Sequence, residues 1–328
     1  MRGRMNLEHT CCSLVIPVYK NFGSLPTLLS ALQGISAELL QRIPGATLEV
    51  VFVVDASPDA SLDWLTAQLP GCGFKTQLLV HSRNFGSFAA IRSGLAAATG
   101  DLFAVMAADL QEPPELVIQF FCALHSEPLD VVIGTRDSRE DPYFSKLASR
   151  LFWATYRRFV QPEMPSGGID MFGCNSAFKA RLLELQERNS SLVGLLMWLG
   201  FRRKVIGYHR RAREHGKSAW TLGKKLNYLL DSVFAFSDLP LKLLMGVGAA
   251  AMLVAAVLGV LALVGRLSGH IQVPGYTMLI IAISFFGALN TFALGVVGSY
   301  VWRAFENTKN RPMAIVCQHL SFNGLPTE

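Results

Sequence analysis

Three signals that mark common classes of protein are missing from this chain of 328 residues. The first ten residues are polar and contain no apolar core of a signal peptide, so we expect the chain not to be exported. The glycine-rich G-x-G-x-x-G and P-loop sequences are absent, which argues against a dinucleotide-binding Rossmann site and a P-loop site. The six cysteines show neither C-x-x-C nor the spacing of metal ligands. We interpret them as small core residues in a reducing compartment.

Charged residues are scarce, at 16% of the chain, and they are unevenly placed. The mean hydropathy of +0.34 is high for a soluble enzyme. Two segments, 243–265 and 271–302, contain no charged residue, and each is longer than the about 20 residues that a helix needs to cross a bilayer. A short polar turn at 266–275 separates them. We therefore predict a hairpin of two transmembrane helices, at 243–265 and 276–300; the alternative is a hairpin buried inside a soluble protein.

Lysine and arginine flank the predicted hairpin on both sides but are nearly absent from its turn. Nine of them lie between residues 202 and 225, and Arg303, Lys309 and Arg311 follow the second helix. The turn contains only Arg266. Because positively charged flanks stay in the cytoplasm, we predict a multi-pass protein of the cytoplasmic (inner) membrane with its large N-terminal domain and both termini in the cytoplasm. The basic residues are a poor indication of nucleic-acid binding, since the adjoining spans hold them at the membrane.

Strand and helix signals alternate along residues 12–134. Short apolar runs predict five strands, at 12–18, 48–54, 76–81, 102–108 and 130–134. Apolar residues at helical spacing predict helices between them, at 24–40, 61–68 and 88–98. Alternation of this kind predicts an α/β fold with a mostly parallel sheet and helices on both of its faces.

Four regions follow from these patterns. Residues 1–220 form the large N-terminal domain, and 221–242 have the pattern of an amphipathic helix lying beside the membrane. The two transmembrane helices occupy 243–302, and 303–328 form a cytoplasmic tail. Within the first region, 143–160 carry apolar residues at helical spacing, which predicts a helix packed on the sheet or on the membrane surface.

The predicted strands end in polar residues that would meet at one edge of the sheet. The apolar run 102–108 is followed by Asp109 and Gln111, and a helix start at Pro113-Pro114 lies just beyond. In open α/β sheets, ligands bind at the carboxyl ends of the strands. A carboxylate and an amide oxygen two residues apart suit a hard divalent cation such as Mg²⁺ that carries phosphate. The alternative is that Asp109 caps the next helix.

Four sequence blocks at these strand ends stand in an order that is found in one family of enzymes. They are Ser13-Leu-Val-Ile-Pro-Val-Tyr19, Val54-Asp-Ala-Ser-Pro-Asp59, Ser82-Arg-Asn-Phe-Gly86 and Asp109-Leu-Gln-Glu-Pro-Pro114. The later blocks agree; they are Gly168-Ile-Asp-Met-Phe172, Arg213-Glu-His-Gly-Lys-Ser218, Gly298-Ser-Tyr300 and Lys309-Asn-Arg-Pro312. Residues 12–315 thus resemble the family 2 glycosyltransferases of the GT-A fold. The branch they resemble acts on polyprenyl phosphates and includes dolichyl-phosphate mannose synthases and bacterial undecaprenyl-phosphate sugar transferases.

The resemblance implies which residues hold the donor. Pro17, Tyr19 and Asp55 would hold the nucleoside of a nucleotide sugar, since the imide N–H of a nucleobase needs an acceptor such as a carboxylate. Asp109 and Gln111 would bind Mg²⁺ or Mn²⁺ on the diphosphate, because this leaving group needs cationic neutralisation.

The resemblance also implies which residues meet the acceptor. Asp170 would lie near the sugar and the acceptor, as a catalytic residue beside Asp109. Because a phosphate acceptor is already anionic at neutral pH, we expect Asp170 to position it rather than to act as an indispensable base. Arg213 and Lys217 would contact phosphates. Arg83 is either a ligand of the nucleotide or a structural partner of Asp109.

The chain departs from the family pattern at two positions. The usual Asp-x-Asp-x-Gln sequence has Ala107 in its first position, so metal binding would depend on Asp109 as the only carboxylate. Mg²⁺ usually keeps several waters and few protein ligands, so the change affects the affinity for the metal more than its identity. The usual pair of aspartates in the nucleobase block is Val54-Asp55 here.

Other polar residues near these blocks have ordinary structural explanations. Asp59 is expected to cap the helix at 61–68. His81 and His209 are expected to be structural, and His215 to be a hydrogen-bonding partner or a phosphate contact.

The function expected from these residues is the inverting transfer of a sugar from a nucleotide donor, UDP rather than GDP, to an undecaprenyl or dolichyl phosphate in the membrane. Its product would be a polyprenyl-monophosphate sugar. One alternative is a processive polysaccharide synthase, although the Gln-x-x-Arg-Trp segment of those enzymes is absent and only two spans are predicted. Another is a catalytically inactive membrane scaffold, which Ala107 suggests. A homo-oligomer is left open.

Overall fold

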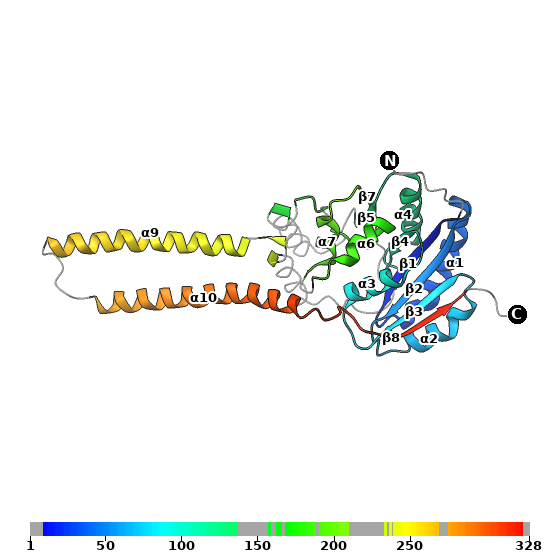
Figure 1. Cartoon of the computed structure of the whole chain (residues 1–328), viewed down its shortest axis with the longest axis horizontal. Coiled ribbons are helices and arrows are strands. Elements are labelled where there is room, and N and C mark those ends of the chain that lie inside the picture. Colours follow the sequence, from blue (N-terminus) through cyan, green and yellow to red (C-terminus); the bar gives the residue numbers. More distant parts are fainter. Residues whose placement is uncertain are drawn as a thin grey trace.

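A globular α/β domain and two long helices that project from it side by side make up the molecule (Figure 1). The structure is a computed structural model and describes residues 9–136, 157–158, 162–165, 168–187, 190–209, 233–234, 236–237, 239–268 and 275–323. The helix predicted at 143–160 lies almost entirely outside the described residues, and so does most of the amphipathic helix predicted at 221–242.

An eight-stranded sheet forms the centre of the globular domain, with the strand order β7-β5-β6-β4-β1-β2-β3-β8. Its strands are β1 (Cys11–Val18), β2 (Thr47–Val54), β3 (Lys75–His81), β4 (Leu102–Val105), β5 (Val131–Arg136), β6 (Met171–Asn175), β7 (Arg203–Tyr208) and β8 (Val316–Phe322). β1 pairs in parallel with β2 and β4, β2 with β3, and β5 with β7. β6 and β8 run antiparallel to their neighbours. The mostly parallel sheet predicted from the sequence is confirmed, but the sequence patterns do not predict β6, β7 or β8.

Helices cover both faces of the sheet, as predicted (Figure 1). They are the 3₁₀ turns η1 (Phe22–Ser24) and η2 (Leu69–Gly71) and the α-helices α1 (Leu25–Arg42), α2 (Ser61–Gln68), α3 (Ser87–Ala97), α4 (Pro114–Ser126), α6 (Ser176–Glu184) and α7 (Leu192–Trp198). On β1, Leu14 and Ile16 belong to an apolar core shared with α1 and α4, whereas Val15 belongs to a second core shared with α3, α6 and α7. Because side chains alternate along a strand, a central strand with both faces buried is a continuous apolar run in sequence.

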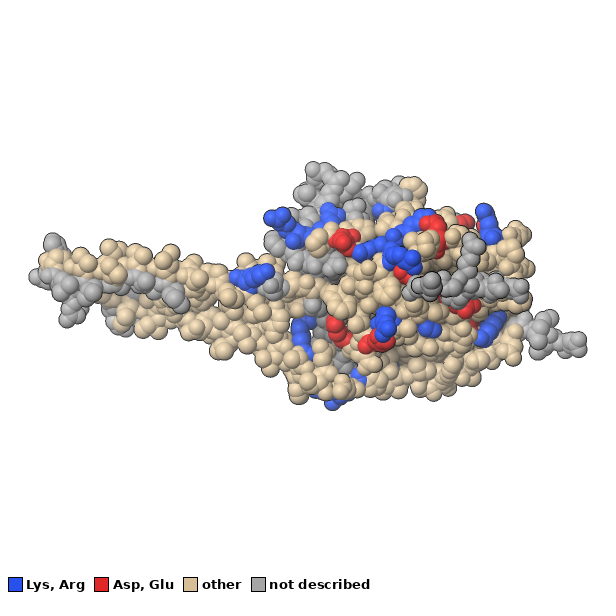
Figure 2. Space-filling model, turned by 45° about the horizontal axis from the view of Figure 1, so that its top comes forward, with Lys and Arg blue, Asp and Glu red and all other residues tan. Residues whose placement is uncertain are grey.

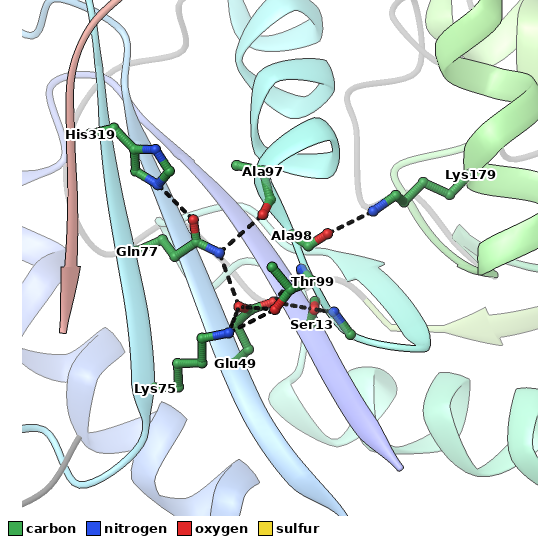
Figure 3. A network of polar contacts seen from close by, with 10 residues as sticks. Ser13, Glu49, Lys75, Gln77, Ala97, Ala98, Thr99, Lys179 and His319 are labelled. Atoms are coloured by element: carbon green, nitrogen blue, oxygen red, sulfur yellow. Dashed lines mark hydrogen bonds and ion pairs between the residues drawn. The ribbon is translucent and has the colours of Figure 1, made fainter. Parts of the chain in front are cut away.

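A buried carboxylate joins the amino ends of the central strands (Figure 3). Glu49 of β2 accepts hydrogen bonds from Ser13 Oγ of β1 at 2.5 Å and Thr99 N at 2.8 Å, and it pairs with Lys75 Nζ of β3 at 2.8 Å. Burial raises the pKa of Glu49, but Lys75, Ser13 and Thr99 more than offset this effect and hold the pKa at about 2. The ionised carboxylate therefore stabilises the packing of three neighbouring elements, away from the edge at which the strands end.

Two long helices, α9 (Leu239–Leu267) and α10 (Tyr276–Thr308), follow the globular domain. Within the part of the chain that the structure describes, the segment Phe285–Thr308 is long and apolar enough to cross a membrane, with a mean hydropathy of 1.3. Leu239–Ala251 is a shorter apolar stretch of helix.

After α10 the chain returns to the globular domain and adds a strand to the sheet. β8 pairs antiparallel with β3, so the region expected to be a tail covers the edge that β3 would otherwise present. Ser82 N donates to Ile315 O at 3.0 Å, and His319 Nε2 lies 2.6 Å from Gln77 Oε1 (Figure 3). The last residues described thus connect α10 to the far edge of the sheet.

The cysteines are all free, and their burial is mixed. Cys12, Cys72 and Cys174 are buried, as their interpretation as core residues requires. Cys317 is exposed on β8, so that interpretation is wrong for this residue: on a strand at the edge of the sheet, a side chain can face solvent.

Candidate active site

The carboxyl ends of β1, β2 and β4 carry backbone that ordinary residues avoid. Non-glycine residues with positive φ are few among those described: Lys20 (58°), Ala56 (49°), Leu110 (54°) and, after α10, Asn310 (46°). The first three each follow one of these strands, and a Cβ atom makes this conformation costly. Strained backbone of this kind gathers at functional sites, where the surrounding structure enforces it. The carboxyl edge of the sheet is therefore the candidate site.

Hydrogen bonds join the loops after β1 and β2. Lys20 N donates to Ser57 Oγ at 2.7 Å, and Phe22 N donates to Asp59 Oδ2 at 3.0 Å. Asp59 also accepts from Ser57 Oγ at 2.6 Å and from Ser61 N, at the start of α2, at 3.3 Å. Burial raises the pKa of Asp59, but these donors outweigh it and lower the pKa below its ordinary value. Asp59 therefore fixes the neighbouring loop and accepts from the first amide of α2, but it is not the N-cap residue that was expected, because Ala60 occupies that position.

Two residues predicted to hold the nucleoside lie at the end of β1. Pro17 is inside the strand, and Tyr19 follows it with 37% of its surface exposed. Lys20 Nζ lies 5.4 Å from the centroid of the Tyr19 ring. Ser24 Oγ donates to Ala108 O at 2.8 Å, which joins this loop to the chain after β4. An open aromatic ring therefore stands at the site, on a loop that is tied to the neighbouring strand ends.

Asp55, at the end of β2, is almost completely buried, and its carboxylate faces the loop 82–86. Its Oδ1 accepts from Phe85 N at 2.8 Å and lies 2.8 Å from His81 Nδ1, and its Oδ2 accepts from Gly86 N at 2.7 Å. Burial raises the pKa of Asp55, but the hydrogen bonds from His81, Phe85 and Gly86 outweigh it, so the pKa lies below its ordinary value. Asp55 is therefore a charged group at neutral pH that holds this loop.

Arg83 lies in the same loop and is exposed. Its guanidinium lies 4.1 Å from the centroid of the Phe85 ring, and its Nη1 donates to Asn84 O at 3.3 Å. Both contacts are within the loop, so the exposed side chain remains accessible to a ligand.

Asp109 and Gln111, the predicted metal ligands, are half-buried on the turn after β4. The left-handed conformation of Leu110 between them lets Gln111 N donate to Asp109 Oδ1 at 3.3 Å. Among the described residues, no group of three or more His, Cys, Asp or Glu side chains could hold a metal. A metal ion here would therefore be held by few protein oxygens, with ligand phosphate and water completing its shell, which is the usual arrangement for Mg²⁺.

Asp170 lies directly before β6 and reaches the same edge because β6 is antiparallel to β4. Arg136, at the end of β5, donates to both of its oxygens, through Nε to Oδ2 and through Nη2 to Oδ1 at 2.6 Å. Tyr208 Oη, at the end of β7, donates to Oδ2 at 2.9 Å. Burial lowers the pKa of Arg136, but Asp170 outweighs it and raises the pKa above its ordinary value. The three side chains form one cluster from three strands.

Arg136 and Tyr208 belong to the candidate site but are absent from the residues predicted from the sequence. Arg136 lies two residues beyond the strand expected at 130–134. Extending that strand by one more pair of alternating residues would have included it. No comparable signal exists for Tyr208, because β7 has exposed positions and does not have the apolar pattern of a buried strand.

Arg213 and Lys217, the predicted phosphate contacts, lie outside the described residues, and so does His215. The described part of the site therefore comprises two groups: the residues at the ends of β1, β2 and β4 around Asp55 and Tyr19, and the cluster around Asp170.

Comparisons with known proteins agree on one family. Residues 13–185 match the model of Glycosyl transferase family 2. A glycosyltransferase of Synechocystis sp. is 30% identical over 320 residues, which is 96% of this chain and 98% of that protein. The putative glycosyltransferase CsbB of Bacillus subtilis is 31% identical over 268 residues, 82% of this chain and 81% of that one. An undecaprenyl-phosphate 4-deoxy-4-formamido-L-arabinose transferase of Serratia proteamaculans is 30% identical over 307 residues, 93% and 92% of the two chains.

The family match covers more than half of the chain and begins and ends within the domain that carries the site. It includes the loops after β1, β2, β3 and β4 as well as Asp170. The chain therefore belongs to glycosyl transferase family 2, and it is a glycosyltransferase.

Proposed function

We propose that this glycosyltransferase moves a hexose from a UDP-sugar to a polyprenyl phosphate, undecaprenyl or dolichyl, at the cytoplasmic face of the membrane, with inversion at the sugar. The observation that carries the proposal is the presence, in one chain, of a sheet edge with candidate groups for a nucleotide sugar and of two long helices without charge in their central segments. The name of the Serratia relative, an undecaprenyl-phosphate sugar transferase aligned over most of both chains, supports the choice of acceptor.

The donor would lie across the ends of β1, β2 and β4. Tyr19 and Pro17 offer apolar and aromatic surface to the nucleoside, and the Asp55 carboxylate offers an acceptor for an imide N–H of the base. Arg83, exposed on the neighbouring loop, is placed to meet a phosphate or the base. Asp109 and Gln111 supply hard oxygen ligands that fit Mg²⁺ or Mn²⁺, and such an ion would neutralise the charge that develops on the leaving diphosphate.

The acceptor would enter from the side of the Asp170 cluster. A phosphate monoester has a second pKa of about 6, so its oxygen is a competent nucleophile at neutral pH without a strong base. The Asp170 carboxylate already accepts hydrogen bonds from Arg136 and Tyr208, which favours a role in orienting neighbouring groups. Arg213 and Lys217 stay proposed contacts of the lipid phosphate or the diphosphate.

The long helices would anchor the enzyme in the bilayer. At 1.5 Å per residue, α9 and α10 are about 43 and 50 Å long, more than the about 30 Å of a hydrocarbon core. Figure 2 shows Lys, Arg, Asp and Glu on the globular domain, whereas the described atoms of the projecting helices are almost all of other residues. Large apolar side chains along them are more than 60% exposed, among them Leu243, Met245, Leu253, Leu279, Phe292 and Leu294. Lipid would cover this surface.

The proposal is tested with the full chain in lipid nanodiscs that contain undecaprenyl phosphate. Radiolabelled nucleotide sugars are added one at a time, and the lipid fraction is analysed for label and for product mass. We expect one hexose per lipid phosphate, and loss of transfer when EDTA removes the metal. The Asp109→Asn variant, which lacks the proposed carboxylate ligand of the metal, is the negative control and should show little transfer. Products that carry several sugars would instead identify a processive synthase, and absence of transfer from every UDP-sugar would overturn the proposal.

A further inference from the structure

A buried histidine stands directly behind the carboxylate that holds the loop 82–86. The His81 side chain is fully buried, with none of its surface exposed, and its Nδ1 lies 2.8 Å from Asp55 Oδ1. Its Nε2 lies 2.9 Å from Ser93 Oγ on α3. The His81 ring also packs edge-on against the Phe85 ring, with 5.5 Å between the centroids. His81 therefore contacts the loop and the helix that follows it, but it is not accessible to a ligand.

The hydrogen bonds determine which nitrogen of His81 carries a proton. A carboxylate only accepts, so Nδ1 must donate to Asp55. In the neutral ring, Nε2 is then an acceptor for the hydroxyl of Ser93. With a neutral ring, the hydrogen bonds run from the Ser93 hydroxyl through His81 to Asp55. In either protonation state, the Asp55 carboxylate cannot rotate without losing a charge-assisted hydrogen bond.

The acceptor positions of Asp55 can be counted. A carboxylate has about four lone-pair positions. Oδ1 uses two of them, for His81 Nδ1 and Phe85 N, and Oδ2 uses one for Gly86 N. One position on Oδ2 is left over after the contacts with described residues. A ligand N–H that approaches Asp55 would therefore find a single acceptor site, whose direction depends on the three donors that hold the carboxylate.

We propose that His81 is a positioning residue for the donor: through Asp55 it fixes both the loop 82–86, whose exposed Arg83 would meet the nucleotide, and the one carboxylate lone pair that the described residues leave unused. The inference rests on the proposed function, because it assigns the loop and Asp55 to the nucleotide sugar. His81 touches no ligand, so its removal should weaken binding of the nucleotide rather than slow the chemical step.

Three variants of the full chain in detergent separate this role from simple packing. His81→Phe keeps a planar ring of similar size but removes both hydrogen bonds. His81→Asn restores a donor near the position of Nδ1, and Ser93→Ala removes only the partner of Nε2. His319→Ala is the matched control, because His319 lies in the same sheet but contacts Gln77, away from the loop.

We expect His81→Phe to raise both the KM for the nucleotide sugar and the Kd for UDP about 10-fold or more, because this is the effect of losing one hydrogen bond to a charged group. The kcat should change less than about 3-fold. His81→Asn should recover most of the affinity, Ser93→Ala should cause a loss of about 2- to 5-fold, and His319→Ala should bind like wild type. Amide hydrogen exchange at Phe85 and Gly86 should become at least several-fold faster in His81→Phe.

The outcomes separate the inference from the proposed function. If wild type transfers sugar but His81→Phe has an unchanged KM and Kd, or lowers kcat alone, the inference is wrong. If wild type neither binds UDP nor transfers sugar, the proposed function fails. Hydrogen exchange still tests the loop in that case, because unchanged exchange at Phe85 and Gly86 would overturn the role of His81 whatever the ligand is.

Discussion

At the scale of single residues, the hydrogen bonds of Asp170 favour a role in orienting neighbouring groups. Arg136 donates to both of its oxygens, and Tyr208 adds a third hydrogen bond. Burial raises the pKa of Tyr208, so the phenol stays protonated and keeps donating. A base that must take a proton during the reaction would need a free lone pair aimed at the acceptor, and most of the lone pairs of Asp170 are already engaged.

The pH dependence of Asp170→Asn tests this role. If Asp170 orients the acceptor, the loss of activity in Asp170→Asn should shrink as the pH rises past about 6, because the phosphate dianion then has no proton to give up. Initial rates of Asp170→Asn and wild type are compared from about pH 5.5 to 8.5. A ratio of the two rates that stays constant across this range would contradict orientation as the main role.

Substitution of Asp109 tests whether this residue binds the metal. As the only carboxylate proposed to bind the metal, it should lose at least about 100-fold in rate on substitution by Asn, whereas the fold survives. Ala107→Asp, which restores the usual family pattern, should lower the concentration of Mg²⁺ or Mn²⁺ needed for half-maximal rate. Circular dichroism controls for folding. Wild-type activity of Asp109→Asn at limiting metal would show that the metal is bound elsewhere.

At the scale of elements, β8 connects α10 to the edge of the site. β8 pairs with β3 along its length, and just before it Ile315 O accepts from Ser82 N, the first residue of the loop 82–86. A strand edge left open exposes unpaired backbone groups. The strand therefore stabilises β3 and holds the start of the loop 82–86.

Deleting residues 313–328 removes β8 and should act on the loop 82–86. We expect a lower midpoint of thermal unfolding and a higher KM for the nucleotide sugar, because Ser82 N and the outer edge of β3 lose their partners. Deleting only 324–328 leaves β8 intact and serves as the control. Equal KM values for the two deletions would show that β8 does not act on the loop 82–86.

Glu49 links three elements and should make stability depend on pH. Its pKa is about 2 in the folded chain and 4.5 ordinarily, so the ionised carboxylate stabilises the fold above about pH 4.5. This contribution, roughly 3 kcal/mol, is lost as the pH falls from 4.5 toward 2. Thermal unfolding of wild type and Glu49→Gln should therefore differ most near neutral pH and converge in acid. A difference that stays constant with pH would contradict the role of the charge.

At the scale of the whole molecule, the distribution of charge predicts how the chain lies in the membrane. Charged residues gather on the globular domain, whereas the described side chains of the projecting helices are mostly apolar (Figure 2). Because basic flanks stay in the cytoplasm, we expect both termini inside and residues 266–275 outside.

Labelling of single cysteines in intact cells tests this topology. The exposed Cys317 and the half-buried Cys11 and Cys122 are first replaced by Ser, so that only the buried natural cysteines remain beside the introduced one. A cysteine at Ser268 should then react with an impermeant reagent, and one at Asn323 should react only after the cells are opened. The reverse pattern would overturn the orientation.

The sequence by itself determined the α/β class, the first five strands and the helices between them. Local signals were sufficient there because these strands are buried on both faces and therefore stand out as apolar runs. The strand ends also identified Asp55 and Asp109 as candidates, since polar groups at the carboxyl edge follow from the alternation alone. Asp170 was a candidate only through the resemblance to the family, because no local pattern predicted β6.

Only the tertiary structure decided which side chains hold these candidates. β6, β7 and β8 are short or exposed, and they are placed by pairing with strands far away in the sequence, a preference that no local pattern records. Arg136 and Tyr208 meet Asp170 across that pairing, and His81 meets Asp55 across neighbouring strands. Residue types and strand ends are local properties of a sequence, whereas the direction of a carboxylate depends on donors that the fold brings to it.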